Sequence, residues 1–440
     1  MHFRTLTIVA AFTGIIYLVY FSQSASAVFV KSKPVAIGEL EQVPPVGSRN
    51  SIRTESYTTK LKSIEERIRA YEKLASRDAT DWIMRERLAR AFMEKAMLTG
   101  NSKDFLPIRR VLAEAFANAP KGSGPLLTAA RFHYAIHELN EAEQHLETLS
   151  KQVLQTKDTS TAAAIARANI DFQRGNYSNA EKFYRRCEAE APGLCRIELA
   201  LFEAHTGNFA VAESLLEASL AETDNSDAQT RAWLLLQLGI LSMEQGQYER
   251  ALTRLNQADE TLPGWWLILE HIAEVTLLQG KIEEAIDRYR EVVKLSDSPQ
   301  FLDALAEAHL ASGNEQEGNL MLSRAEKRWE EELELLPNSG SSHAMEHFLN
   351  HSPNGARLVK LAEQNAKLRA SGEHRVLLVR AYLKTGNLEA ASREINSILQ
   401  TPHVSADLFD VASQVYTALG DKEKSADFRA KTLAINPSYN

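Results

Sequence analysis

The chain has 440 residues, of which 44% are hydrophobic and 25% charged, so it is long enough for several domains or one long repeat array with a large buried core. Its 50 basic and 58 acidic residues give a net charge of −8. No cluster of Lys and Arg overrides that balance, and affinity for a phosphate backbone depends on such clusters, so we expect no nucleic-acid partner.

An apolar run near the amino terminus predicts export or membrane attachment. The run covers residues 6–21 and is followed by three small residues at 25–27. This pattern is typical of a signal peptide over residues 1–27. Residues 5–30 are also long and apolar enough to be a retained membrane anchor. Both alternatives place the body of the protein outside the cytoplasm, in a periplasm or an equivalent compartment.

The next segment, residues 28–59, predicts a flexible linker. It is rich in Pro, Ser and Thr and has no helical periodicity. An amphipathic helix is expected to begin at Lys60, because Leu61, Ile64 and Ile68 follow at helical spacing.

A short motif then recurs along the chain: a glycine, one residue, an aromatic or aliphatic residue, two residues and an alanine. Clear copies are GNYSNA at 175, GNFAVA at 207, GQYERA at 246, GKIEEA at 280 and GNLEAA at 386, and weaker copies begin at 137, 313 and 420. Most of the spacings between neighbouring copies cluster near 34 residues. A fixed period of this length is typical of repeat architectures.

The copy at Gly246 shows what one repeat encodes. Leu235 and Leu238 precede the glycine at helical spacing, and Ala251 and Leu255 follow it in the same way. Gly246 ends the first helix, where a left-handed residue without a Cβ costs least. The pattern predicts two antiparallel helices joined by a tight turn.

This repeat closely resembles that of the tetratricopeptide family, which implies an all-α superhelix of helical hairpins (an α-solenoid). The resemblance is strong over 158–337 and 373–440, and weaker over 60–157, where the helical repeats are degenerate. Residues 338–372 interrupt the register, because Gly313 and Gly386 are 73 residues apart, and we expect an irregular helical hairpin there.

The resemblance also implies a concave groove, which in the tetratricopeptide family is lined by the first helix of each repeat. A peptide or helix of a protein partner is the expected ligand. The alternative is that the same side chains pack against neighbouring repeats or the chain's own ends. The groove positions implied for this chain are Asn169, Phe172, Leu201, His205, Trp233, Ile240, Met243 and Leu277.

The chain has two cysteines, Cys187 and Cys195, on either side of a Pro-Gly turn. In an oxidising compartment a pair this close is a disulfide candidate, and two buried free thiols are the alternative.

Three histidines at 343, 347 and 351 recur every fourth residue in the segment that breaks the register. The outer two are about 12 Å apart along a helix, too far to share one ion, so at most His343 and His347 could form a metal site. The order HExxH is absent, and so are phosphate-binding loops and nucleophile motifs. We therefore expect no catalytic residue, metal or cofactor.

The sequence as a whole predicts a non-enzymatic protein-protein interaction scaffold outside the cytoplasm, which binds an envelope protein in an assembly, export or maturation complex. The alternative is a metal-binding or metal-dependent protein centred on His343 and His347.

Overall fold

The computed structural model describes residues 55–439 apart from 153–155, 297, 340 and 352–353. Within these residues the chain is all α-helix with one short 3-10 turn and no strand. The predicted signal peptide or anchor at 1–27, the anchor alternative at 5–30 and most of the predicted linker lie outside them. In the part of the chain so described, no helix combines the length and apolarity that crossing a membrane requires.

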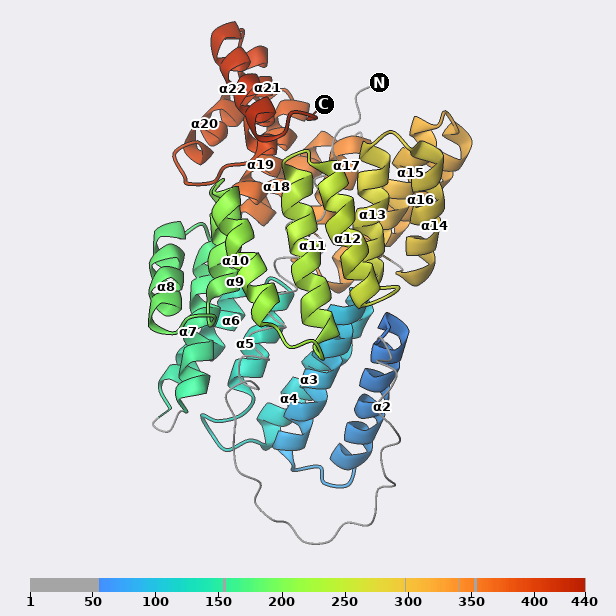
Figure 1. The fold of residues 1–440 in the computed structure, drawn as a ribbon. Coiled ribbons are helices and arrows are strands. Elements are labelled where there is room, and N and C mark those ends of the chain that lie inside the picture. Colours follow the sequence, from blue (N-terminus) through green and yellow to red (C-terminus); the bar gives the residue numbers. More distant parts are fainter. Residues whose placement is uncertain (1–54, 153–155, 297, 340, 352–353, 440) are drawn as a thin grey trace.

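A first helix, α2 (Tyr57–Ala75), precedes ten antiparallel helical pairs in the described residues, which we number 1 to 10 (Figure 1). In chain order the pairs are α3 (Trp82–Thr99) with α4 (Leu106–Asn118), α5 (Leu126–Ala135) with α6 (Leu139–Ser150), α7 (Lys157–Gln173) with α8 (Tyr177–Glu190), α9 (Arg196–His205) with α10 (Phe209–Glu222), α11 (Ala228–Glu244) with α12 (Tyr248–Thr261), α13 (Trp266–Leu278) with α14 (Ile282–Leu295), α15 (Pro299–Ala311) with α16 (Glu315–Leu335), α17 (Ser341–His351) with α18 (Gly355–Leu368), α19 (Gly372–Lys384) with α20 (Leu388–Ile398), and α21 (Ala406–Ala418) with α22 (Lys422–Ile435). The 3-10 turn η1 (Ser102–Phe105) lies between α3 and α4.

The predicted all-α superhelix of helical hairpins is confirmed, and pair 5 shows why these residues form it. Gly246 has a φ of 70°, the left-handed conformation that ends α11. Ala251 and Leu255 of α12 are fully buried. A Cβ placed on Gly239 of α11 would lie 2.9 Å from the Leu255 side chain, so the two helices approach too closely for a larger residue at that point.

The first helix begins earlier than expected, so the predicted boundary of the linker at residue 59 is wrong by a few residues. Helix α2 starts at Tyr57, where Ser56 and Thr59 form a reciprocal capping box. The amide of Tyr57 donates to the carbonyl oxygen of Pro263 at 3.1 Å, and its ring is buried. The array therefore already includes residues 57–59.

A helical hairpin does occupy the range 338–372, as α17 and α18. It packs against α16 on one side and α19 on the other. The 73-residue spacing between Gly313 and Gly386 is explained by this additional pair together with α16, which at 21 residues is longer than its neighbours. The stacking of pairs continues through the place where the sequence motif lapses.

The superhelix closes on itself, which places the C-terminal pairs against the middle of the chain. In Figure 1 the C-terminal helices α19 to α22 lie beyond the upper ends of α10 and α11. The amide of Gly372 donates to the hydroxyl of Tyr177 at 2.6 Å, and the amide of Val404 donates to the carbonyl oxygen of His205 at 3.0 Å. We call these contacts, between the turns of pairs 3 to 5 and residues 370–374, 403–405 and 436–438, the seam.

Candidate functional site

The predicted groove is largely closed by the chain itself, which corrects its assignment as a free partner-binding surface. Three of its residues, Phe172, Leu201 and Met243, are half-buried. The other five are at most 7% exposed and lie among side chains of the same chain: Asn169, His205, Trp233, Ile240 and Leu277. The alternative given with the prediction, packing against neighbouring repeats and the chain's own ends, describes these five.

His205 shows how the C-terminal region covers this face. Its ring lies 4.2 Å from the ring of His403, centroid to centroid, and the two Nδ1 atoms are 3.2 Å apart. Phe172 contacts the ring of His205 edge-on at 4.9 Å. The carboxylate of Glu373 is 3.5 Å from Nδ1 of His205. Burial, together with the neighbouring His205, lowers the pKa of His403 to about 3, so this ring is neutral at physiological pH.

The remaining buried groove residues are structural. The amide oxygen of Asn169 accepts a hydrogen bond of 2.7 Å from the buried hydroxyl of Tyr184. Trp233 and Ile240 belong to the large apolar core of the first pairs, and Leu277 belongs to the next core along the array.

The seam covers the turns between the two helices of pairs 3, 4 and 5. A Cβ added at Gly175 would lie 2.6 Å from the carbonyl oxygen of Ala370, and one at Gly207 would lie 2.7 Å from the side chain of Val404. A Cβ at Gly246 would meet the side chain of Asn436 at 2.3 Å. In pairs 6, 7, 9 and 10 the turn glycine is exposed, and no described atom lies within 4 Å of the same position, namely at Gly280, Gly313, Gly386 and Gly420.

The histidine segment is built into the packing of α15, α16 and α17. The carboxylate of Asp303 accepts a bond of 2.7 Å from Nε1 of Trp329, and its other oxygen is 2.7 Å from Nδ1 of His347. His343 stacks on the ring of Trp329, with centroids 6.4 Å apart. His351 lies 3.9 Å from Glu307.

These contacts bear on the metal site considered at His343 and His347. Burial lowers the pKa of His343 to about 4, and Nδ1 of His347 is occupied by Asp303. Of the residues that the model describes, no group of three or more ligand side chains with metal-binding spacing includes either histidine. Within the described residues these two histidines therefore have no third ligand beside them, and a two-histidine site there stays a prediction.

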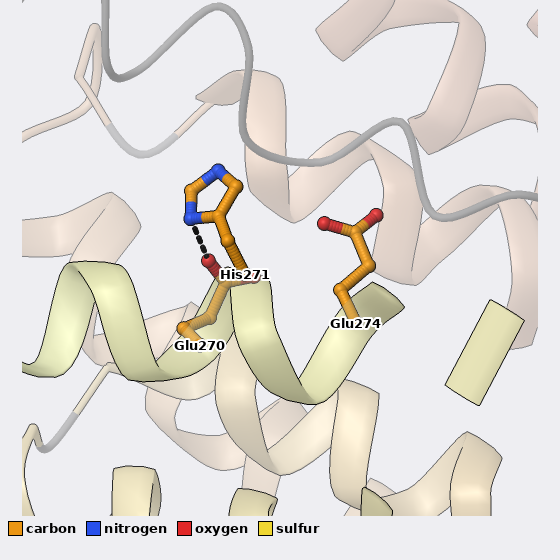
Figure 2. A group of neighbouring side chains, drawn as sticks. All are labelled: Glu270, His271 and Glu274. Carbon is orange, nitrogen blue, oxygen red and sulfur yellow. Dashed lines mark ion pairs between the residues drawn. The ribbon is translucent and has the colours of Figure 1, made fainter. Parts of the chain in front are cut away.

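One group with such spacing does occur, on α13. Glu270, His271 and Glu274 each offer a ligand atom, and these atoms lie within 4.8 Å of one another (Figure 2). All three side chains are at most 3% exposed. Nδ1 of His271 lies 2.7 Å from a carboxylate oxygen of Glu270 and 2.7 Å from the carbonyl oxygen of Leu267.

The electrostatic surroundings of this group are negative. Burial raises the pKa of Glu274 well above its usual range, and the nearby carboxyls of Glu270, Glu346 and Glu307 raise it further. Burial likewise raises the pKa of Glu346, on α17, to about 8. Carboxyl groups on α13, α15 and α17, in pairs 6 to 8, thus lie close together where water does little to stabilise their charges.

Sequence reasoning missed this group, although a signal was present. Helix α13 reads WLILEHIAEVTLL, apolar all round except for four residues, three of which form the group. A helix of that kind is expected to be buried, so ionisable residues within it are costly and call for an explanation. The seam residues Gly372 and Val404 carried no comparable signal.

Cys187 and Cys195 form a disulfide in the structure, with Cα atoms 5.8 Å apart. The bond links the last turn of α8 to the residue before α9, and Cys195 is fully buried. It fixes the loop between pairs 3 and 4.

No family model matches the sequence, and no curated protein matches it. Among solved structures, the chain is similar to a tetratricopeptide repeat protein from Parabacteroides merdae, with 18% identity over 55% of this chain and 91% of that one and a TM-score of 0.35. It is similar to a chain of the APC/C hetero-tetramer Cut9-Hcn1, with 13% identity over 95% of this chain and 78% of that one and a TM-score of 0.43.

A thermophilic tetratricopeptide protein of Thermus thermophilus, TTC0263, gives 20% identity, coverage of 41% and 97%, and a TM-score of 0.32. Because these scores are low, we base the fold on the helical pairs themselves. Their glycine turns and small contact residues make the described chain a tetratricopeptide-like helical repeat array.

Proposed function

We propose that the protein is a non-enzymatic protein-protein interaction scaffold outside the cytoplasm, and that it binds an extended segment of an envelope protein on the open turns of its later pairs. The observation that carries this proposal is the seam. On the turns of pairs 3 to 5 the chain packs the segments before α19 and α21, and the residues after α22, against the turn residues, so such a turn can accept a short backbone segment.

The seam contacts supply the chemistry of that mode. Val404 and Gly372 each donate a backbone amide to the turn region, one to the carbonyl oxygen of His205 and one to the hydroxyl of Tyr177. The turn glycines leave room for the approaching segment, since a Cβ at Gly175 would collide with the backbone of Ala370. Backbone bonds combined with a few side-chain contacts are how extended peptides are recognised in general.

The open turns at Gly280, Gly313, Gly386 and Gly420 repeat this geometry without a covering segment in the described residues. Each is followed by a polar residue, and the two central turns both read Gly-Asn. A partner segment laid across them would occupy the place that residues 370–374 and 403–405 take on earlier turns. This replaces the buried concave groove as the proposed binding surface.

Two features support a location outside the cytoplasm. The apolar segment at 6–21 has the pattern of an export signal or anchor. The disulfide between Cys187 and Cys195 is a bond that persists in oxidising compartments. The mass of the mature protein distinguishes the two alternatives, because a retained Met1 in the membrane fraction excludes cleavage after Ala27.

Site-specific photo-crosslinking in intact cells tests the binding surface. A photoreactive residue at Asn314 or Asn387, on two open turns, is expected to give the same discrete adduct, with mass spectrometry identifying one envelope protein. The matched control is Asn225, in the exposed loop before α11 at the other end of the helical pairs. Equal adducts from all three positions, or none from Asn314 and Asn387, would refute the proposed surface.

A further inference from the structure

We propose that Glu270, His271 and Glu274 form a binding site for one divalent first-row transition-metal cation inside the array, with zinc as the best-suited ion. This site is separate from the proposed peptide surface, and the proposal does not depend on it.

The geometry of the group provides the first argument. The three residues occupy positions i, i+1 and i+4 of α13, and Figure 2 shows the side chains of His271 and Glu274 rising from the same side of the helix. Their ligand atoms lie within 4.8 Å of one another. Ligands about 2.0–2.2 Å from a tetrahedral zinc ion are roughly 3.3–3.6 Å apart, so the atoms need to close by about 1 Å.

The unpaired atoms provide the second argument. Among the residues that the structure describes, Nε2 of His271 and Oε2 of Glu274 meet no hydrogen-bond partner, although both residues are almost completely buried. A buried polar atom without a partner costs about 1–3 kcal/mol, so such atoms point to a missing ligand. The three residues come from one rigid helix that neighbouring pairs enclose on both sides.

The state of the imidazole provides the third argument. A carbonyl oxygen can only accept, so the 2.7 Å contact between Nδ1 of His271 and the oxygen of Leu267 requires a proton on Nδ1. The neutral ring then carries its lone pair on Nε2. A metal-bound histidine usually donates its other N–H to a backbone carbonyl or a carboxylate, and Nδ1 of His271 faces the carbonyl oxygen of Leu267.

Charge and ligand type identify the ion. Carboxyl groups that bind a metal ion are deprotonated, so as ligands Glu270 and Glu274 carry a charge of −2, which one divalent cation balances. An imidazole combined with carboxylates suits zinc and similar first-row ions, whereas calcium and magnesium prefer oxygen ligands throughout. The three side chains are at most 3% exposed, so solvent has little access to the ion. The expected role of the ion is to balance the charge of the two carboxylates and to stabilise α13.

The test uses the full chain, purified in detergent, stripped with a chelator and dialysed separately against Zn²⁺ and Mn²⁺. We expect about one Zn²⁺ per chain by elemental analysis, and a higher thermal midpoint when Zn²⁺ is present. Glu274→Gln and His271→Asn should each weaken binding at least about tenfold and abolish the thermal shift. The matched control is Glu198→Gln, which changes a buried carboxylate on the corresponding helix of pair 4 and should bind as the wild type does.

Two results would overturn the proposal. The first is a wild-type chain that retains no Zn²⁺ at concentrations on the order of 1 mM, the weak end of specific binding. The second is undiminished binding in both variants while their circular dichroism matches that of the wild type, because the metal then sits on other histidines. Gln has nearly the same shape as Glu, and Asn is a neutral polar residue smaller than His. Both substitutions are therefore chosen to preserve the fold for the two measurements.

Discussion

The imidazole of His205, at the end of α9, lies 4.2 Å from that of His403, which is 198 residues further along the chain. This contact is part of the seam that joins pair 4 to the loop before pair 10. It explains why a residue expected to face a partner is instead 7% exposed.

Acid should weaken the seam through His403. Burial, and to a lesser extent His205, lowers the pKa of this ring from its ordinary value to about 3. The ring is therefore neutral in the folded protein at pH 5, whereas in the unfolded chain it takes up a proton near pH 6.5. The contribution to stability is complete above about pH 6.5 and is lost as the pH falls toward 3. Between pH 7.5 and pH 5 the loss is about 2 kcal/mol.

Urea unfolding at a series of pH values measures this effect. The variant His403→Gln lacks the titrating ring, so its stability should fall less steeply between pH 6.5 and 5 than that of the wild type. Parallel curves for the two proteins would show that His403 does not sense the pH in this range.

Two glycines offer a matched test of the seam. Gly175 and Gly280 have φ values of 75° and 76°, so alanine at either costs about 1 kcal/mol of backbone strain. Only Gly175 has a backbone atom, the oxygen of Ala370, where the new methyl would lie. Gly175→Ala should therefore lower the free energy of unfolding by about 1–3 kcal/mol more than Gly280→Ala does. Equal losses in chemical denaturation would mean that the seam adds nothing at this turn.

Asp303 is expected to hold three helices together. Removing its carboxylate by Asp303→Ala leaves the indole N–H of Trp329 and the ring of His347 without their acceptor, in a site where Asp303 is 5% exposed. We expect a loss of about 3 kcal/mol or more in the free energy of unfolding, and a shift in tryptophan emission.

A surface carboxylate is the control for that prediction. The side chain of Asp287 is 77% exposed and forms a surface ion pair with Arg290, so Asp287→Ala should change stability by less than about 0.5 kcal/mol. A comparable loss from both variants would contradict the central place given to Asp303.

The disulfide should stabilise the chain through the unfolded state. Cys187 and Cys195 close a loop of about nine residues, for which the chain-entropy model gives about 2–3 kcal/mol. The double variant Cys187→Ser and Cys195→Ser should lose that amount in urea, and adding a reductant should destabilise the wild type but leave the variant unchanged. A reductant effect on the variant as well would point to a cause other than this bond.

The helical pairs were predictable because the information that specifies them is local. A glycine turn and small residues such as Ala251 lie within one repeat, so a single period of sequence contains both helices and their contact. Between Gly313 and Gly386 the motif lapses, but α17 and α18 still bury small residues, Ala344 and Ala362, so the expected hairpin continues the array.

The seam was not predictable from the repeats, because it depends on small rotations summed over several pairs. Nothing near His205 in the sequence indicates that His403 will reach it. The same limit affected the groove, where five of eight predicted residues are buried. The group on α13 has a single histidine between two glutamates, so it lacks the repeated histidine spacing by which a metal site is usually recognised in a sequence.

The seam also changes how such an array unfolds. Stacked repeats in contact only with their neighbours can lose one unit at a time from an end, because each unit's stability depends on the next one alone. Here pair 10 and its following residues are held by pairs 4 and 5, so the terminal unit cannot peel away without breaking contacts across nearly 200 residues of chain. We therefore expect a single cooperative unfolding transition. Inserting or deleting a pair between pairs 4 and 10 would also move the seam residues at 403–405 and 436–438 away from the turns that they contact.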